Sequence, residues 1–302
     1  MAVLSAKTWL FTLLALVAAG FLVVWVRRVL AARRAGTQRV EAPGPLEVAI
    51  GFVTNFFDTL GIGSFAPTTS VFKLKGLVPD ENIPGTLNVG HTVPVVAQAF
   101  IYVAIIQADM TTLITLIVSA VLGGWLGAGV VSRWPRRNIQ LGMGLGLLIM
   151  GGFFVLQNLD EMRGSPVIPG GDAIGLDGVW LVVAAAGIFG LGALLTLGIG
   201  LYAPCLLMIS LLGMNPRVAF PIMMGACAFL MPVASARFVQ AERYSLRPAL
   251  GLALGGLPAV LIAAFLVKSL SLTAVRWLVV VVVLYTAVTM LRSARRARAP
   301  AP

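Results

Sequence analysis

The polar residues best placed to do chemistry in this chain flank a glycine-rich interruption within an apolar segment, Gly61-Ile62-Gly63-Ser64. Glycine permits a sharp turn and lets a ligand approach the backbone closely. Pro67 suits the first turn of a following helix, which would carry the hydroxyls of Thr68, Thr69 and Ser70. These hydroxyls, the free backbone N–H groups and the positive helix end would together form an anion site. The alternative is that the hydroxyls only cap the helix.

Two ionisable residues accompany this interruption. Asp58 is the only acidic residue that we place within the membrane, where a functional role is the first hypothesis. It would carry a proton, with His91 as a second coupling group, or else tie down the backbone as a buried acid. Asn88, His91 and Thr92 share one helical face at spacings of three and four residues. Such a stripe either contacts substrate or makes hydrogen bonds between helices.

A second copy of the interruption follows 137 positions later, as Gly198-Ile199-Gly200-Leu201-Tyr202-Ala203-Pro204. The same offset aligns Gly76 with Gly213 and Pro84 with Pro221, which indicates an internal duplication. Interrupted apolar segments at matching positions in two halves point to the binding site of a transporter. The substrate-binding candidates in the second copy are Gly198, Gly200, Tyr202 and Cys205. Because Cys205 and two leucines replace the hydroxyl residues of the first copy, we expect the first repeat to hold most of the substrate.

The composition is that of a polytopic membrane protein. Hydrophobic residues make up 59% of the 302 positions and charged residues only 11%, against about 25% in soluble domains. The formal net charge is +11, but the arginines lie in short clusters beside apolar spans, so nucleic-acid binding is not expected. Cys205 and Cys227 both lie in apolar sequence and predict neither a disulfide nor a metal site.

The hydropathy pattern predicts an all-α fold with seven full spans and two broken segments. The expected full spans are 8–26, 84–106, 111–131, 139–157, 218–236, 248–267 and 272–291. The broken segments are 46–60 with 66–77 and 179–197 with 204–214. The corresponding regions are an N-terminal anchor and Arg-rich linker (1–45), repeat 1 (46–157), an acidic loop (158–178), repeat 2 (179–291) and a basic tail (292–302).

Charge counting predicts how the broken segments run. If each is a re-entrant hairpin, 17 of the 22 basic residues lie in the cytoplasm, whereas single crossings leave only 13 there. The hairpin topology places the N-terminus outside, the acidic loop outside and the C-terminus in the cytoplasm. One hairpin and three spans make an odd number of crossings, so the two repeats would have inverted topology, which allows alternating access. The segment 179–197 is long enough to cross alone, which leaves the alternative open.

The motifs around both breaks resemble those of the sulfite exporter TauE/SafE family, over roughly residues 46 to 291. The resemblance is carried by Phe57-Asp58-Thr59-Leu60-Gly61-Ile62-Gly63-Ser64, by Ile83-Pro84-Gly85-Thr86-Leu87-Asn88-Val89-Gly90-His91-Thr92 and by the repeated Gly198-Ile199-Gly200. The commoner family pattern has three consecutive glycines, where this chain has Gly63-Ser64-Phe65. The resemblance implies export of small sulfur-containing anions such as sulfite or sulfonates, driven by an ion gradient across a bacterial cytoplasmic membrane.

The sequence therefore predicts a secondary transporter, with the lipid bilayer and a small anion as its partners. No P-loop, HExxH or GxSxG motif is present, so we expect neither an enzyme nor a bound cofactor. Two alternatives remain: a permease that imports another small solute, and a non-transporting membrane scaffold. The polar residues beside the first break argue against a scaffold. The sequence does not indicate an oligomeric state.

Overall fold

The computed structural model describes residues 2–34, 41–163, 171–266 and 273–296, and the regular secondary structure in these ranges is helical. The first half contains α1 (Ala2–Arg34), α2 (Pro45–Thr59), α3 (Phe65–Lys75), α4 (Ile83–Ile105), α5 (Met110–Val131) and α6 (Arg136–Arg163). The second half contains α7 (Gly178–Leu195), α8 (Tyr202–Leu211), α9 (Ala219–Gln240), α10 (Leu246–Leu266) and α11 (Thr273–Arg296). Within the described ranges there is no β-strand, which confirms the all-α prediction.

Seven of the described helices are long and apolar enough to cross a membrane: α1, α4, α5, α6, α7, α9 and α10. The chain is therefore a multi-pass membrane protein. Helices α2, α3 and α8 have 15, 11 and 10 residues, too few to cross a hydrocarbon core of about 30 Å at 1.5 Å per residue. The seven include α7, which the sequence assigned to a broken segment, and omit α11, which the sequence counted as a full span.

Two helices extend well beyond their expected apolar spans. Helix α1 continues through its arginines to Arg34, because Ala and Arg are strong helix formers that sustain a helix outside the hydrocarbon. Helix α6 runs to Arg163 and takes up the start of the acidic loop expected at 158–178. Apolar length thus marks the membrane-embedded part of a helix and not its ends.

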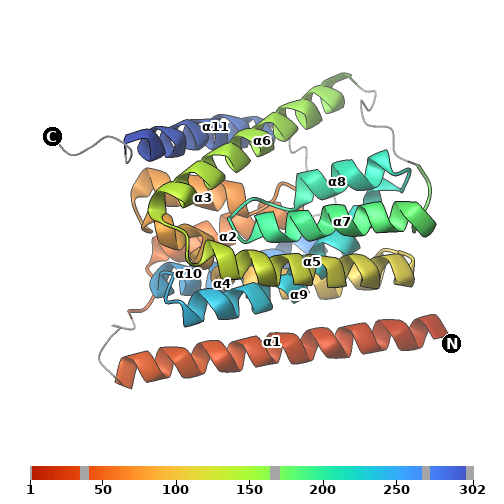
Figure 1. Ribbon diagram of the computed structural model, residues 1–302, viewed down its shortest axis with the longest axis horizontal. Helices are drawn as coiled ribbons and strands as arrows, with labels where there is room; N and C mark the ends of the chain where they lie inside the picture. Colours follow the sequence, from red (N-terminus) through yellow and green to blue (C-terminus); the bar gives the residue numbers. More distant parts are fainter. Residues whose placement is uncertain (1, 35–40, 164–170, 267–272, 297–302) are drawn as a thin grey trace.

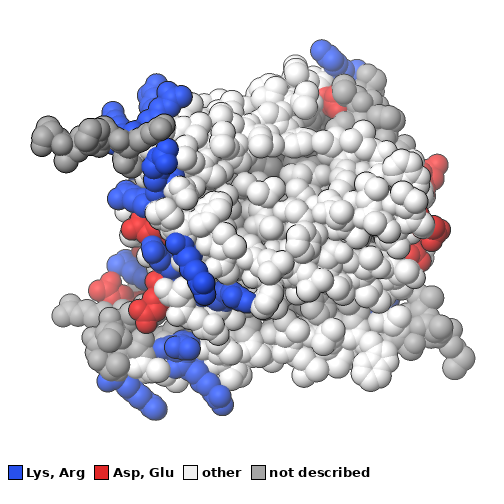
Figure 2. Space-filling model, viewed as in Figure 1, with Lys and Arg blue, Asp and Glu red and all other residues white. Residues whose placement is uncertain are grey.

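Charged side chains gather at the two ends of the molecule. Figure 2 shows most Lys and Arg side chains at one end, with a few acidic side chains among them, and mainly acidic side chains at the opposite end. Helices α1 and α11 end, and α6 and α10 begin, at the basic end (Figure 1). On the face shown in Figure 2, few charged side chains lie between the two ends, as expected of a lipid-facing surface.

Polar contacts tie the ends of the α2–α3 pair and of the α7–α8 pair to neighbouring segments. Helix α2 begins beside Arg247, whose Nε lies 3.0 Å from Glu47 Oε1, and α3 ends near an ion pair between Lys73 and Asp80. Helix α10, which carries Arg247, begins at the basic end (Figure 1). At the other end, the strand-like segment before α7 meets the chain after α8, where the amide of Asn215 donates to Ala173 O at 2.8 Å. The ends of the α2–α3 pair and those of the α7–α8 pair therefore make separate sets of contacts in the described bundle.

The helix pairings of the first half recur in the second half at the offset of 137 residues. Helix α2 packs on α10, and the equivalent helix α7 packs on α5. Two further pairs, α4 with α9 and α6 with α11, each join a helix to its own equivalent. Glycines permit these close contacts: a Cβ at Gly255 of α10 would lie 2.0 Å from Val48 O, and one at Gly123 of α5 would lie 1.9 Å from Phe189 O. Helix α1 lies outside this arrangement, along α9 at one side of the bundle (Figure 1).

Candidate functional site

The two glycine-rich breaks form the same backbone turn. In the first, Gly61 has a φ of 93° and its amide donates to Asp58 O at 2.9 Å. In the second, Gly198 has a φ of 94° and its amide donates to Leu195 O at 2.9 Å. Positive φ in this range favours glycine, which explains why both copies carry it at this point. The duplicated motif thus specifies a duplicated turn at the tip of each helix pair.

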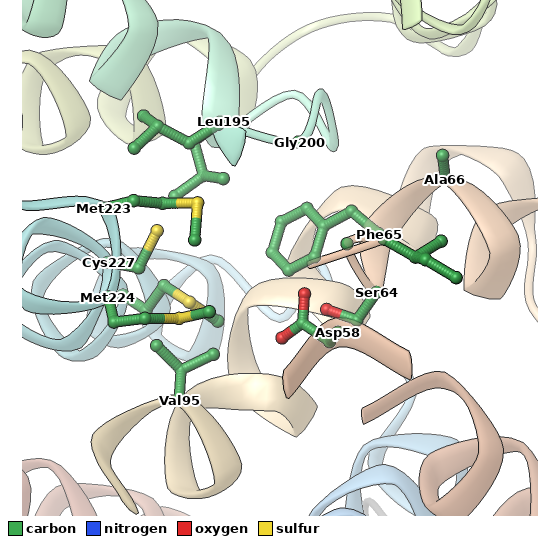
Figure 3. Close-up of a pocket in the computed structure, with 14 residues that line it drawn as sticks. Asp58, Ser64, Phe65, Ala66, Val95, Leu195, Gly200, Met223, Met224 and Cys227 are labelled. Carbon is green, nitrogen blue, oxygen red and sulfur yellow. The ribbon is translucent and has the colours of Figure 1, made fainter. Parts of the chain in front are cut away.

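The two turns meet at a small cavity between the halves, which we call the tip cavity (Figure 3). Its volume is about 40 Å³, enough for a few water molecules. The first turn and α2 contribute Asp58, Ile62, Gly63, Ser64, Phe65 and Ala66; the second turn and α7 contribute Leu195, Gly200 and Leu201; and α4 and α9 contribute Val95, Met223, Met224, Cys227 and Met231.

Among the described residues, Asp58 is the one charged residue that lines the tip cavity, and it is 8% exposed. Gln98 Nε2 donates to its Oδ2 at 2.9 Å, and the Ser64 amide and hydroxyl both hydrogen bond to the carboxylate. Figure 3 shows the Ser64 side chain beside the carboxylate at the start of α3. The carboxylate therefore lies where the positive end of α3 would receive an anion. Any substrate anion bound there meets Asp58 directly.

His91 lies behind the cavity in a buried network that joins three helices. Asn55 of α2 donates through Nδ2 to Gly51 O at 2.7 Å, so its Oδ1, 3.0 Å from His91 Nδ1, must accept. His91 therefore carries a hydrogen on Nδ1, and a neutral ring would accept at Nε2 from the Thr68 hydroxyl, 3.2 Å away. In this arrangement His91 is neutral and both ring nitrogens are engaged. It positions α3 against α2 and α4 and has no contact with the tip cavity.

The remaining hydroxyl and amide candidates are also satisfied within the protein or buried away from the tip cavity. Thr92 donates to Asn88 O at 2.6 Å and lies 3.2 Å from the Ser235 hydroxyl, while Asn88 Nδ2 donates to Pro84 O. Ser70 donates to Ala66 O at 2.9 Å. The Thr69 hydroxyl is buried and has no partner among the described residues.

The structure thus divides the expected substrate-binding residues into separate groups. Three of them line the tip cavity, Gly63, Ser64 and Gly200, together with the expected coupling residue Asp58. Gly61 and Gly198 shape the turns, and Cys205 is fully buried within α8. The side chain of Tyr202 lies outside the described part of the chain.

Several site residues were not anticipated from the sequence. Gln98 holds Asp58, and the Tyr102 hydroxyl donates to Thr59 O on the same turn. Both continue the face of α4 that carries Asn88 and His91 at intervals of three or four residues, so the polar stripe could have been extended to them. Asn55 lies on α2 and does not belong to this stripe, and its contact with His91 arises only from the packing of α2 against α4.

Four sulfur-bearing side chains of α9 were also not anticipated as cavity residues. Met223, Cys227 and Met231 recur every four residues and therefore lie on one face, with Met224 beside them. Figure 3 shows Met223, Met224 and Cys227 turned toward the cavity from the side opposite Asp58. The wall facing the carboxylate is therefore apolar and polarisable, with no basic residue in the lining.

A charged cluster anchors the first helix pair at the basic end. Asp80, 4% exposed, accepts from Lys73 at 2.6 Å, from Gln140 at 2.8 Å and from Arg136 at 3.3 Å. Through Asp80, Lys73 of α3 and Arg136 at the start of α6 are thus held together. Among the described residues, no group of three or more His, Cys, Asp or Glu side chains is arranged to hold a metal ion.

The chain was also compared with protein-family models, with curated proteins and with solved structures, and none of the three comparisons gave a match.

Proposed function

We propose that this protein is a secondary transporter of a small anion, with its substrate site at the tip cavity. The observation that carries this proposal is the meeting of two equivalent backbone breaks at one buried cavity that contains one carboxylate. Backbone breaks at membrane depth persist only where protein or an aqueous cavity covers them. A scaffold requires neither the breaks nor a buried acid between them.

The helix arrangement supports alternating access by inverted repeats. In the proposed topology the α2–α3 and α7–α8 pairs enter from opposite ends, and equivalent helices pair across the two halves. Contacts of Gly144 with Leu291 and of Gly151 with Leu284 show that α6 and α11 run antiparallel, as repeats of opposite topology would. The tip cavity is smaller than an oxyanion with its hydration, so loading requires the two tips to separate. Movement of one repeat against the other provides that opening.

The charges around the tip cavity set the sign of the proposed coupling. An ionised Asp58 occupies the positive end of α3 and repels a second anion. A proton on Asp58 removes that repulsion and frees the Ser64 donors for the substrate. Proton and anion therefore bind together, and the anion and proton cross in the same direction. In the proposed mechanism His91 does not carry the proton, because Asn55 and Thr68 engage both its nitrogens.

The substrate class that we favour is a sulfur-containing oxyanion such as sulfite or a sulfonate. The donors at the start of α3 suit its oxygens, and the thioether wall of α9 suits a polarisable sulfur-bearing group. In the proposed orientation the basic end faces the cytoplasm of a bacterial cell, in agreement with the positive-inside rule. The N-terminus then lies outside and the C-terminus inside.

A second candidate is a permease for an uncharged solute. The observation that favours it is the apolar lining: apart from Asp58 and Ser64, the side chains around the tip cavity are apolar or carry sulfur. A neutral solute would fit this lining without protonation of the carboxylate.

Transport by purified protein in proteoliposomes separates the two candidates. We expect uptake of radiolabelled sulfite or a small sulfonate to exceed that of empty vesicles and to be inhibited by other sulfur oxyanions. A panel of uncharged thiols and amides serves as the comparison. Transport of an uncharged solute that sulfur oxyanions do not inhibit would support the permease, and transport of neither class would contradict both.

A further inference from the structure

A groove on the membrane-facing side separates α1 from the body of the protein. Its walls are α1, α5 and α9, and they include Gly20, Val24, Trp125, Val233, Arg237 and Gln240. Figure 1 shows α1 running beside α9 along one side of the bundle. The groove is distant from the tip cavity and shares no residue with it.

Arg237 is an unusual residue for such a surface. Its Cζ lies 4.3 Å from the centre of the Trp125 ring, and its Nη1 would lie 3.0 Å from a Cβ at Gly129. The side chain therefore lies along α5, inward of that helix's end at Val131. A guanidinium near the edge of the hydrocarbon is costly without a counter-charge, and stacking on Trp125 offsets only part of that cost.

No carboxylate of the described chain neutralises Arg237. The ion pairs among the described residues take up Lys73, Arg136 and Arg247, and Arg237 belongs to none of them. The groove's other polar side chain, the exposed amide of Gln240, lies one turn further along α9. A cation and an amide donor therefore face the same space at the basic end, where lipid headgroups begin.

We propose that this groove binds an anionic phospholipid. The phosphate lies against Arg237 and accepts from Gln240, and one acyl chain runs along the apolar walls toward Val24 and Gly20. Basic pockets between membrane helices bind anionic headgroups in this way. A zwitterionic lipid fits less well, because its ammonium group would bring a second cation close to Arg237.

Gly20 provides the space for the acyl chain. It faces the groove, and a Cβ added there would meet no atom within 4 Å. A larger side chain at this position is therefore compatible with the fold but occupies the groove. Since glycine is a poor helix former, the replacement also favours the α1 helix.

The experiment is a lipid titration of the full-length protein in detergent, followed by native mass spectrometry, with phosphatidylglycerol and phosphatidylcholine as probes. We expect Arg237→Gln to weaken phosphatidylglycerol binding at least tenfold, the effect of losing hydrogen bonds to a charged group. Arg133→Gln makes the same charge change at the same end, on an exposed residue outside the groove, and should alter affinity by less than about twofold. Gly20→Leu should weaken binding of phosphatidylglycerol while leaving the unfolding temperature unchanged or higher.

Three results would overturn the proposal. These are unchanged phosphatidylglycerol affinity in Arg237→Gln, equal affinity of the native protein for the two lipids, and unchanged affinity in Gly20→Leu. The Gly20 variant decides the matter if Arg237→Gln does not fold. A dimer that dissociates on substitution of Arg237 would also contradict it, because the groove would then be an interface between two copies.

Discussion

The two breaks share a backbone and differ in chemistry. At the offset of 137 residues, Gly61 corresponds to Gly198 and both adopt the same φ, yet Asp58 corresponds to Leu195 and Ser64 to Leu201. The buried network shows the same loss, since Thr68 corresponds to Cys205 and His91 to Ala228. One repeat therefore supplies the polar groups, while the other supplies a matching turn with an apolar lining.

In the proposed transporter, this difference would allow a symmetric frame to hold an asymmetric ligand. Under the proposed alternating access, a turn that closes one side has a counterpart on the opposite face, which would account for the duplicated backbone. A buried charge is costly, and two carboxylates in one small cavity would repel each other, so Asp58 has no acidic counterpart. The expectation that the first repeat holds most of the substrate stays a prediction. At the tip cavity the polar side chains of the first repeat are Asp58 and Ser64, and Thr68 to Ser70 lie outside its lining.

The largest expected effect concerns the proposal that the α2–α3 and α7–α8 pairs enter the membrane from opposite faces. Single cysteines at Arg133, Asp172 and Arg296, all exposed, should react with a membrane-impermeant thiol reagent from inside, outside and inside respectively. Replacement of Cys205 and Cys227 by Ala provides the background. Labelling of position 133 from outside would contradict the opposite topology of the two repeats. The two breaks could then no longer be compared as equivalent sites.

The next effect is on proton coupling. Asp58→Asn mimics the protonated acid, so substrate exchange should persist while flux driven by a pH gradient is lost. Anion affinity of the native protein should rise as the pH falls, because protonation of Asp58 removes the repulsion, and affinity of the variant should not depend on pH. Exchange and driven flux are measured on one proteoliposome preparation, with Leu195→Met, at the equivalent position, as the control.

Intact pH-driven flux in Asp58→Asn would exclude a carrier role for Asp58. Loss of both activities, with an unchanged elution profile, would assign Asp58 to holding the turn through Gln98 and Ser64.

Local signals in the sequence predicted the turns and most helix boundaries. Gly61, Gly198 and the prolines that follow fix where the chain breaks, because few other residues adopt those backbone angles. The contacts of the site could not be predicted in the same way. Gln98 meets Asp58, and Asn55 meets His91, only because α2 and α4 pack with particular rotations about their axes. The ends of α1 were missed because polar helix formers extend it past the membrane.

A smaller effect is expected in the buried network. Thr68→Val keeps the volume of the side chain but leaves His91 Nε2 without a donor, so it should cost about 1–3 kcal/mol of stability. Cys205→Ala, at the equivalent position of α8, removes only a buried sulfur and should cost roughly 1 kcal/mol. Thermal unfolding in detergent measures both. Equal losses would mean that the Thr68–His91 bond contributes little and that the two repeats do not differ here.

The smallest expected difference is between the two turn glycines, and it tests what the repeats share. Gly61 and Gly198 have φ values of 93° and 94°, a region that costs a residue with a side chain about 1–2 kcal/mol. Gly61→Ala and Gly198→Ala should therefore destabilise the protein by similar amounts. A Cβ at Gly198 would lie 3.0 Å from Met143 Cε and 3.2 Å from Leu87 Cδ1, both ends of flexible side chains. Gly198→Ala should therefore destabilise the protein by less than about 1 kcal/mol more than Gly61→Ala. A much larger loss of stability at one glycine would show that only that turn is held rigidly. The two repeats would then differ in their backbones as well as in their polar side chains.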